Sequence, residues 1–282
     1  MRDEDLRASA NIDDRRGGSG LARGGLGIGA VAVLTLIGWV TGIDPAVLIG
    51  GAEQVRGVGQ TEPAGRTGAP TDAVGGFVAR VLGETEDVWS ATLPAQTGRA
   101  YQAPVLVLFS GATTSGCGTA QSAMGPFYCP LDRKLYLDTS FFNDMRARMG
   151  GGGEFAYAYV IAHEVGHHIQ NLLGVLPRVQ EAQRAAPNRA VANALSVRTE
   201  LMADCLAGVW ANRMQARRAN LDEADLRQAV DTAAAIGDDR LQRQAGRVVP
   251  DSFTHGSAEQ RVRALVQGLR GGTVQSCDAI IN

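Results

Sequence analysis

Apolar residues follow two different spacings along the chain, and the change between them divides it. Before residue 150 the apolar runs of the folded region are short and rich in Val, Leu and aromatic side chains, which is typical of strands. Three runs of this kind occupy residues 103–110, 127–129 and 135–137. From Glu154 onward apolar positions recur at helical spacing. Strands grouped before helices predict an α+β domain with a small N-terminal sheet and a helical C-terminal half.

The helical half is predicted to contain three long helices. The first covers residues 154–172, and Gly174 provides its stop. The second covers residues 190–216. The third covers residues 222–245, with an interruption at Gly237.

The first half also contains a predicted helix and a predicted loop. Thr71 or Asp72 can cap a helix that runs to about Leu82, with a second helical turn toward Ala91. A stretch rich in Gly, Ser and Thr over residues 111–123 predicts a loop after the first strand.

A third pattern comes before this half, since residues 24–43 contain no charged side chain. At 1.5 Å per residue such a helix crosses a hydrocarbon core of about 30 Å, which predicts one transmembrane helix. Arg15, Arg16 and Arg23 precede the span, and positive residues favour the cytoplasmic side of a membrane. A cleaved signal peptide, whose apolar core is normally shorter, and a buried soluble helix are the alternatives.

These patterns divide the chain into four segments. Residues 1–23 are expected to form a flexible cytoplasmic N-terminus, and residues 24–43 the transmembrane helix. Residues 44–70 are expected to form a linker, and residues 71–282 the folded domain. The domain would then lie outside the cytoplasm, in the periplasm or the extracellular space, attached to the cytoplasmic membrane by a single pass.

Composition and charge narrow the range of partners. With 282 residues and 45% hydrophobic side chains, the chain can bury a sizeable core. Its formal net charge of -2 provides no positive field for nucleic acid, so we expect no nucleic-acid partner.

Candidate chemistry lies in the first predicted helix, which contains a His-Glu-x-x-His motif. His163 and His167 are four residues apart, so both imidazoles point to one side of a helix and can bind one metal ion. Glu164 lies beside them, where its carboxylate can take a proton from water on that ion. Two nitrogen ligands, an open coordination position and a carboxylate base are what a zinc hydrolase requires. The neighbouring His168 points off this face and is interpreted as a structural histidine.

The second predicted helix supplies a candidate third ligand. Glu200 and Asp204 are also four residues apart, beside an apolar stripe. Two carboxylates in such surroundings cost desolvation free energy unless they are paired or bind metal. We assign Glu200 to the metal and Asp204 to the far N–H of a ligand histidine, whose ring it would orient.

The four cysteines contain no Cys-x-x-Cys pair of the kind that binds structural zinc. Outside the cytoplasm an even number favours disulfides. Cys117 and Cys129 are close in sequence and are predicted to pair, which leaves Cys205 for Cys277. Four cysteines allow three pairings, and free buried thiols are the alternative.

The motifs together resemble a known family. The His-Glu-x-x-His and Glu-x-x-x-Asp pair resembles the gluzincin metallopeptidases, and most of the chain is similar to the neutral zinc metallopeptidase family of bacteria. Further segments that match this family are residues 11–17, 116–118, 125–130, 136–138 and 253–256. The resemblance implies a zincin-like peptidase domain with Zn²⁺ as cofactor and a peptide or protein as substrate.

The likeness to membrane-associated gluzincins implies two further site residues. His255 precedes the last predicted helix and Arg261 lies within it, and by this likeness either side chain could stabilise the oxyanion of the tetrahedral intermediate. The alternative is structural: His255 caps or packs, and Arg261 pairs with an acid.

Gluzincins also bind substrate backbone along the edge strand of their sheet. Pro126 and Pro130 flank one predicted strand and cannot donate ladder hydrogen bonds, so this strand suits an edge. The resemblance therefore implies that Phe127 and Tyr128 line the cleft beside the zinc. The alternative is that both aromatic side chains fill the core.

The sequence supports the hypothesis of a membrane-anchored zinc metalloendopeptidase. His163, His167 and Glu200 would hold the zinc, and Glu164 would act as base. A catalytically silent zinc-binding protein, tethered to the membrane as an assembly or interaction factor, is the alternative. Three ligands and a free carboxylate favour catalysis, because structural zinc usually has four protein ligands.

Overall fold

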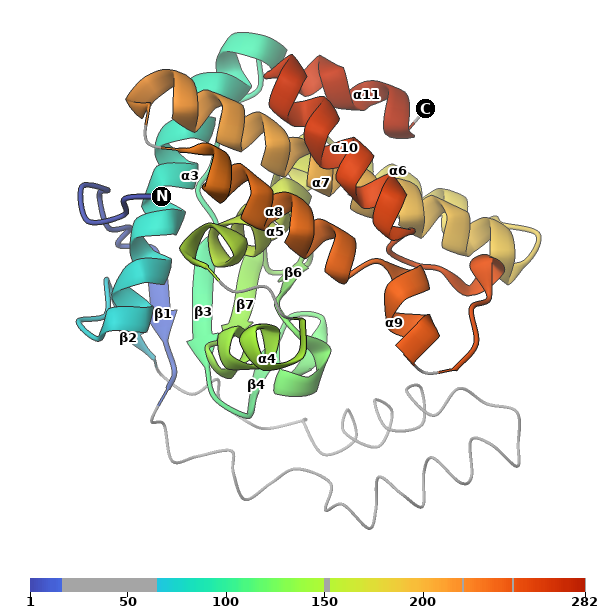
Figure 1. Cartoon of the computed structure of the whole chain (residues 1–282), viewed down its shortest axis with the longest axis horizontal. Coiled ribbons are helices and arrows are strands. Elements are labelled where there is room, and N and C mark those ends of the chain that lie inside the picture. Colours follow the sequence, from blue (N-terminus) through green and yellow to red (C-terminus); the bar gives the residue numbers. More distant parts are fainter. Residues whose placement is uncertain (17–64, 150–152, 220, 245, 282) are drawn as a thin grey trace.

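The computed structural model describes residues 1–16, 65–149, 153–219, 221–244 and 246–281. Figure 1 shows a small sheet on one side of the molecule and a group of long helices on the other. The structure is therefore the predicted α+β domain, with strands concentrated in the first half of the chain and helices in the second.

The sheet has five strands in the order β2-β1-β3-β7-β6. They are β1 (Ile12–Asp14), β2 (Arg66–Thr67), β3 (Val105–Phe109), β6 (Phe127–Cys129) and β7 (Lys134–Asp138). β3 is parallel to both β1 and β7, whereas β2 and β6 pair antiparallel to their neighbours. The predicted strands β3, β6 and β7 are confirmed, and β6 lies at an edge of the sheet as its flanking prolines indicated.

Alternating side chains of the strands enter two different cores. Leu106 and Leu108 of β3 face the main core with the helices, while Val107 and Phe109 face a smaller cluster on the other side. A hairpin of β4 (Ala112–Ser115) and β5 (Gly118–Gln121) contributes the buried Ala120 to the small cluster. The predicted loop over residues 111–123 is therefore wrong. A two-residue turn, with the following Gly118 at φ 114°, lets this polar stretch fold back on itself.

The helices confirm the predicted division of the second half. They are α3 (Ala73–Thr97), α4 (Ser140–Met149), α5 (Glu154–Leu172), α6 (Val175–Arg184), α7 (Arg189–Arg218), α8 (Glu223–Ala235), α9 (Asp238–Gln244), α10 (Ala258–Gly271) and α11 (Asp278–Ile281). Gly237 separates α8 from α9 as predicted. α5 occupies the centre of the molecule, because it contacts α3, α6, α7, α8 and strand β6.

One helix replaces the two helical segments predicted over residues 71–91. Asp72 caps α3 by accepting a hydrogen bond from the backbone of Gly75, as expected. The helix then continues through Gly83 instead of ending at Leu82. A Cβ at Gly83 would lie 2.0 Å from the carbonyl oxygen of Arg7, so the glycine makes room for the N-terminal segment that crosses the helix there.

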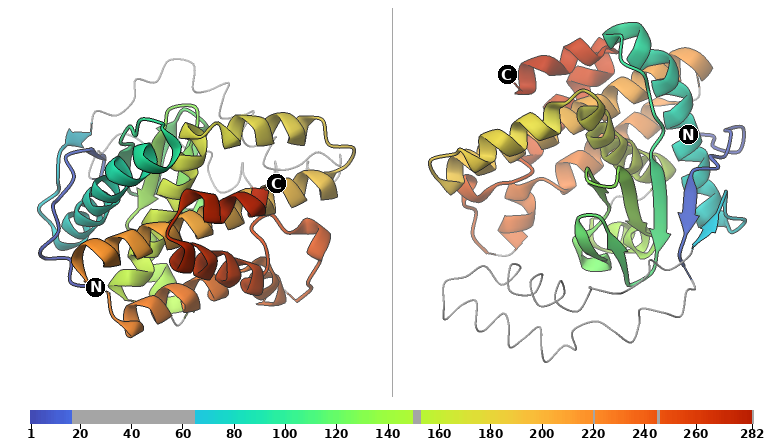
Figure 2. Two further views of the ribbon diagram at one scale, coloured as in Figure 1. Left: turned by 90° about the horizontal axis from the view of Figure 1, so that it is seen from above. Right: turned by 180° about the vertical axis from the view of Figure 1, so that it is seen from behind.

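Residues 1–16 belong to the folded domain. The prediction of a flexible segment over residues 1–23 is therefore wrong for residues 1–16, and residues 17–23 lie outside the described residues. β1 lies inside the sheet beside β3, as the right-hand view of Figure 2 shows in blue, and Ile12 is 1% exposed. Glu86 of α3 accepts hydrogen bonds from Arg7, Ser9 and Asn11. The predicted linker over residues 44–70 also contributes, because β2 belongs to the sheet. The partners lie more than 50 residues away in the chain, so local composition does not reveal them.

The predicted transmembrane helix, residues 24–43, lies outside the described residues and stays a prediction. Among the helices that the structure does describe, none combines the length and apolar character that a membrane crossing requires. The pairing of β1 with β3 still bears on the predicted topology, because a backbone ladder cannot form across a bilayer. Residues 1–16 and residues 65–281 therefore lie on one side of any membrane. A cytoplasmic N-terminus with the folded domain outside conflicts with this pairing.

Candidate metal centre

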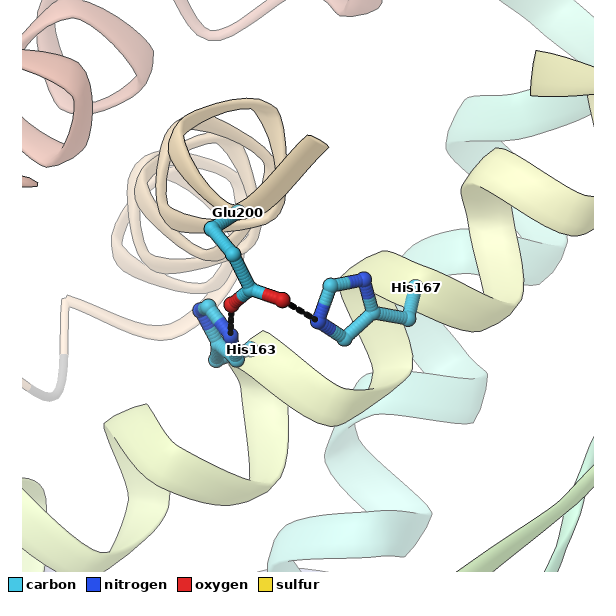
Figure 3. A group of neighbouring side chains, drawn as sticks. All are labelled: His163, His167 and Glu200. Carbon is cyan, nitrogen blue, oxygen red and sulfur yellow. Dashed lines mark hydrogen bonds and ion pairs between the residues drawn. The ribbon is translucent and has the colours of Figure 1, made fainter. Parts of the chain in front are cut away.

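Three side chains from two helices converge at the centre of the molecule. α5 presents His163 and His167, and α7 presents Glu200 between them (Figure 3). The carboxylate oxygens of Glu200 lie 3.1 Å from Nε2 of His163 and 3.5 Å from Nε2 of His167. One ligand atom from each of the three residues lies within 4.8 Å of the others.

A close crossing of the two helices creates this geometry. The four-residue spacing places both histidines on the α5 face that meets α7. Gly166 lies between them, and a Cβ there would be 2.9 Å from the carbonyl oxygen of Ala203. The absence of a side chain at this point of the His-Glu-x-x-His motif therefore lets α7 approach closely enough for Glu200 to reach both rings.

The donor set fits zinc. Two imidazole nitrogens and one carboxylate oxygen are ligands that Zn²⁺ accepts, and three protein ligands leave a coordination position for water or substrate. The surroundings also favour positive charge. Burial opposes the charged form of His163, but Asp204 and Glu200 outweigh it and raise the pKa of the imidazole to about 10. Zinc and protons therefore compete for the same nitrogen atoms.

His163 is oriented by a buried ionic network, as the sequence indicated for Asp204. Oδ1 of Asp204 lies 2.8 Å from Nδ1 of His163 and also accepts from the hydroxyl of Tyr159. Arg261 donates to both carboxylate oxygens of Asp204 at 2.9 Å. Burial raises the pKa of Asp204, but Arg261 and His163 lower it further, to about 2, so the carboxylate stays ionised.

This network gives Arg261 a structural partner. Its Nε and Nη2 are bound to Asp204, and Nη1 lies 3.4 Å from the carbonyl oxygen of Ile236. The guanidinium also lies at the wall of the cleft. The contacts match the alternative in which Arg261 pairs with an acid, and its action reaches the metal through Asp204 and His163.

His167 has a different partner, Gln170, which the sequence analysis missed. Nδ1 of His167 lies 2.9 Å from Oε1 of Gln170. The only available signal was position, because a residue three places after a helical ligand lies on the same side of the helix. A neutral amide gives no hint in the sequence comparable to that of a carboxylate.

Glu164 lies beside the ligands and is 8% exposed. Burial raises the pKa of its carboxyl group, and the nearby His163 and His167 lower it less, so the net shift is upward. No hydrogen bond or salt bridge joins this carboxylate to another described residue within the distances that define the other pairs. The side chain lines the same cleft as the three ligands.

The cleft has a volume of about 540 Å³, and away from the metal ligands its lining combines apolar side chains with the uncharged polar residues Gln180, Gln183, Ser196 and Thr199. One part of its wall comes from the sheet edge and its neighbours: Met124, Pro126, Phe127 and Phe141. Another part comes from the helices: Val160, Leu176, Val179, Ile236 and Leu241. Apart from Glu164, Glu200, Arg261 and the histidines, no charged side chain among the described residues lines it.

β6 forms the sheet side of this cleft, and both Phe127 and Tyr128 line it. Their side chains are largely occupied elsewhere. Phe127 stacks on Tyr136 with ring centroids 5.0 Å apart, and the Tyr128 hydroxyl is bound by Asn171 at 2.9 Å and by His168 at 3.1 Å. His168 also lies 2.6 Å from the carbonyl oxygen of Gln102, which confirms its structural assignment. These contacts fix the two side chains, and β6 ends the sheet on the side of the cleft.

His255 lies at the mouth of the cleft and is the most exposed of the site residues. Its loop is held by Asp238, whose Oδ2 accepts from the backbone N–H groups of Thr254, His255 and Gly256. Nδ1 of His255 lies 3.5 Å from Oδ1 of the same carboxylate. The ring is thereby fixed at the wall of the cleft that also contains Glu164.

The predicted Cys117–Cys129 disulfide is present, and Cys205 pairs with Cys277, a pairing that the sequence left open; both disulfides lie next to the site. Cys117–Cys129 joins the turn of the β4–β5 hairpin to the end of β6. Cys205–Cys277 joins α7, at the residue after Asp204, to the C-terminal segment. The described residues contain no free cysteine.

Comparison with known proteins agrees with this site. The sequence profile of the family described as "Putative neutral zinc metallopeptidase" matches residues 1–280. "Uncharacterized protein YpfJ" of Escherichia coli is 43% identical over 291 residues, which cover 99% of this chain and 98% of that protein. "Uncharacterized protein Rv2575" of Mycobacterium tuberculosis is 42% identical over 225 residues, which cover 76% of this chain and 73% of that protein. A search of solved structures finds no match.

The family match extends over nearly the whole chain, including the N-terminal strand and all three converging ligands. Zinc is the cofactor that this family implies, and the buried pair of imidazoles with one carboxylate fits it. The chain belongs to the neutral zinc metallopeptidase family.

Proposed function

We propose that the chain is a zinc-dependent endopeptidase that hydrolyses peptide bonds within extended, apolar segments of a polypeptide. The observation that carries the proposal is the position of Glu164. Its buried carboxylate lines the same cleft as His163, His167 and Glu200, and that cleft borders a strand edge with no partner strand in the part of the chain that the structure describes. A purely structural zinc site requires neither a free carboxylate nor a cleft.

The chain's own residues perform the proton transfers of this mechanism. When bound, zinc supplies Lewis acidity toward a water molecule and toward the carbonyl oxygen of the scissile bond. Glu164 accepts the proton of the attacking water and passes it to the departing amine. The upward shift of the Glu164 pKa by burial strengthens its capacity to hold that proton between the two steps.

Two further groups support the transition state and the substrate. His255, fixed by Asp238 at the mouth of the cleft, is placed to donate to the oxyanion of the tetrahedral intermediate. The outer edge of β6 has no strand partner among the described residues and can pair with an extended peptide. The substrate would then add a strand to the sheet, with its scissile bond directed toward α5.

The lining of the cleft supports internal cleavage. An exopeptidase needs a charged group that binds the terminal ammonium or carboxylate of its substrate. Among the described residues, the ionisable groups at this cleft are Glu164, the zinc ligands, His255, and Arg261, which is already paired with Asp204. The apolar side chains around them suit uncharged residues of a substrate on both sides of the scissile bond.

The proposal also includes a compartment. Two disulfides among the described residues are stable in an oxidising environment, so we propose that the domain, including residues 1–16, works outside the cytoplasm. A single pass through residues 24–43 would separate residues 1–16 from the strand with which they pair, so the proposal does not include it. Membrane attachment stays a prediction, which fractionation of cells that express the chain with and without that stretch would test.

The decisive experiment uses the purified full chain and a library of internally quenched peptides with both ends blocked. We expect cleavage next to apolar residues, its loss with a chelator and its return with Zn²⁺. Glu164→Gln preserves the shape of the side chain and should retain zinc while turnover falls by about 10²- to 10⁴-fold. A zinc-loaded, folded wild-type protein that cleaves no peptide would favour the catalytically silent alternative, and unchanged turnover in Glu164→Gln would reject the role of this residue.

A further inference from the structure

We propose that Gln170 is a positioning residue for the metal, which fixes the second ligand, His167, and ties it to the helix that carries the third ligand, Glu200. The proposal concerns zinc binding and does not rest on peptidase activity. It can therefore fail while the proposed function stands, and the reverse also holds.

The hydrogen bonds of Gln170 determine how its amide is oriented. The side chain is 0% exposed, and its Nε2 donates to the carbonyl oxygen of Thr199 at 2.7 Å. A carbonyl oxygen can only accept, so the NH₂ group of the amide must face Thr199. Oε1 then faces Nδ1 of His167 at 2.9 Å. The orientation of the amide follows from its partner and not from an arbitrary choice between O and N.

This orientation selects one tautomer of His167. Oε1 is an acceptor, so Nδ1 of the imidazole carries the proton and donates it to Gln170. Nε2 is then the nitrogen with a free lone pair, and it is the atom that lies 3.5 Å from Glu200. Gln170 thereby aims the coordinating nitrogen at the point where the three ligands converge.

The same amide links two ligand helices. Thr199 directly precedes Glu200 in α7, while Gln170 and His167 belong to α5. One buried side chain therefore spans the interface and couples the position of the second ligand to that of the third. Close approach at Gly166 brings the helices together, and Gln170 sets their register beside it.

The neutral partner of His167 also explains the charge arrangement of the site. His163 has an anionic partner, Asp204, and that charge is offset by the buried Arg261. Glu164, Glu200 and Asp204 together carry three negative charges, which one guanidinium and one divalent zinc balance to zero. A carboxylate in place of Gln170 would require a further buried cation, whereas an amide orients the ring without adding charge.

The test compares metal affinity with folding. Gln170→Leu and Gln170→Met remove both hydrogen bonds and replace the amide with an apolar side chain of similar size. We expect the Kd for Zn²⁺, measured by competition with a chromophoric chelator, to rise by about 10- to 100-fold. The visible absorption of the Co²⁺-substituted protein should change, because the geometry at His167 changes. Circular dichroism of the zinc-free variants establishes first that they are folded.

Two matched variants separate positioning from general helix damage. Asn171→Leu removes the next amide on the same helix, which binds Tyr128 and no ligand, and should leave the Kd and the cobalt spectrum unchanged. Gln170→Glu keeps an oxygen that accepts from His167 but loses the donor to Thr199 and adds a buried charge, so its affinity should stay below that of the wild type. A folded Gln170→Leu or Gln170→Met variant with wild-type affinity and spectrum overturns the proposal, as does an equal loss in Asn171→Leu.

A measurement without mutation covers the case in which neither apolar variant folds. In the zinc-loaded wild-type protein with ¹⁵N-labelled histidine, the Nδ1 proton of His167 should be visible and protected from exchange with solvent. A proton that exchanges rapidly, or an Nδ1 without a proton, contradicts the hydrogen bond to Gln170.

Discussion

The α5–α7 interface and the five-stranded sheet meet at β6, but different interactions hold each of them together. At the helix interface His163, Asp204, Arg261 and Gln170 are buried polar groups with partners in the neighbouring helix or in α10. The strands of the sheet contribute apolar side chains to both of its faces. A change at the helix interface should therefore alter metal binding first, whereas a change in the sheet should alter folding first.

The largest effect that tests this difference is expected for Glu200→Ala. The variant removes the one carboxylate that lies between both ligand histidines, so the Kd for zinc should rise by several orders of magnitude. Chelator competition and metal analysis of the dialysed protein measure this loss. The zinc-free variant should keep the helical content of the zinc-free wild type. Stoichiometric zinc in Glu200→Ala after dialysis, with both histidines intact, would remove Glu200 from the ligand set.

The opposite result is expected for Ile12→Ala in β1. Ile12 is 1% exposed and packs in the main core, so its truncation should lower the free energy of unfolding by about 2–5 kcal/mol. Urea denaturation of the zinc-free protein measures this change. The folded variant should bind zinc with the wild-type Kd, because β1 touches none of the ligands. If Ile12→Ala unfolds with the same free energy as the wild type, residues 1–16 do not stabilise the fold and form the flexible segment that their composition predicts.

The smallest expected effect concerns the ion pair between Arg16 and Asp72, which joins the N-terminal segment to α3. Hydrogen bonds from Arg16 and from the backbone of Gly75 lower the pKa of Asp72 to about 2. Since the folded-state pKa lies below the ordinary value of 3.8, the pair stabilises the fold above that value and loses its effect as pH falls toward 2. The exposed position limits the contribution to less than about 1 kcal/mol.

Asp72→Asn isolates this charge, because asparagine is also a good helix cap. Unfolding free energies of wild type and variant should differ at pH 7 and converge near pH 2. A difference that stays constant between those values would assign the effect to capping and not to the ion pair.

The parts of the structure that could be predicted depend on residues close to one another in the sequence. The ligands on α5 and α7 were predictable because two spacings of four residues fall within strong helical periodicity. The edge position of β6 followed from Pro126 and Pro130. In each case the informative residues lie within a few positions of one another.

The features that the sequence did not predict depend on partners far away in the chain or on side chains without charge. β1 has three residues, too few for an alternating pattern, and its segment is fixed by Glu86 and other groups on α3. The helix predicted to end at about Leu82 continues through Gly83, which accommodates the backbone of Arg7. Gln170 carries no charge that would mark it as part of a metal site. Local patterns therefore revealed the ligands and the frame of the domain but not the contacts that complete them.

The central position of β1 also sets an order of events during folding. Ile12 pairs with Leu106, and Asp13 pairs with Thr67 on the other side, so β1 has neither neighbour when it is synthesised. Bringing β1 to β3 closes a loop of roughly 90 residues, at an entropic cost of about 4 kcal/mol before any contact forms. Such distant parallel pairing is slow compared with the formation of α5 and α7. β1 is synthesised well before its partners and is therefore among the last strands to be fixed, and until it pairs the β3 edge stays open to other chains.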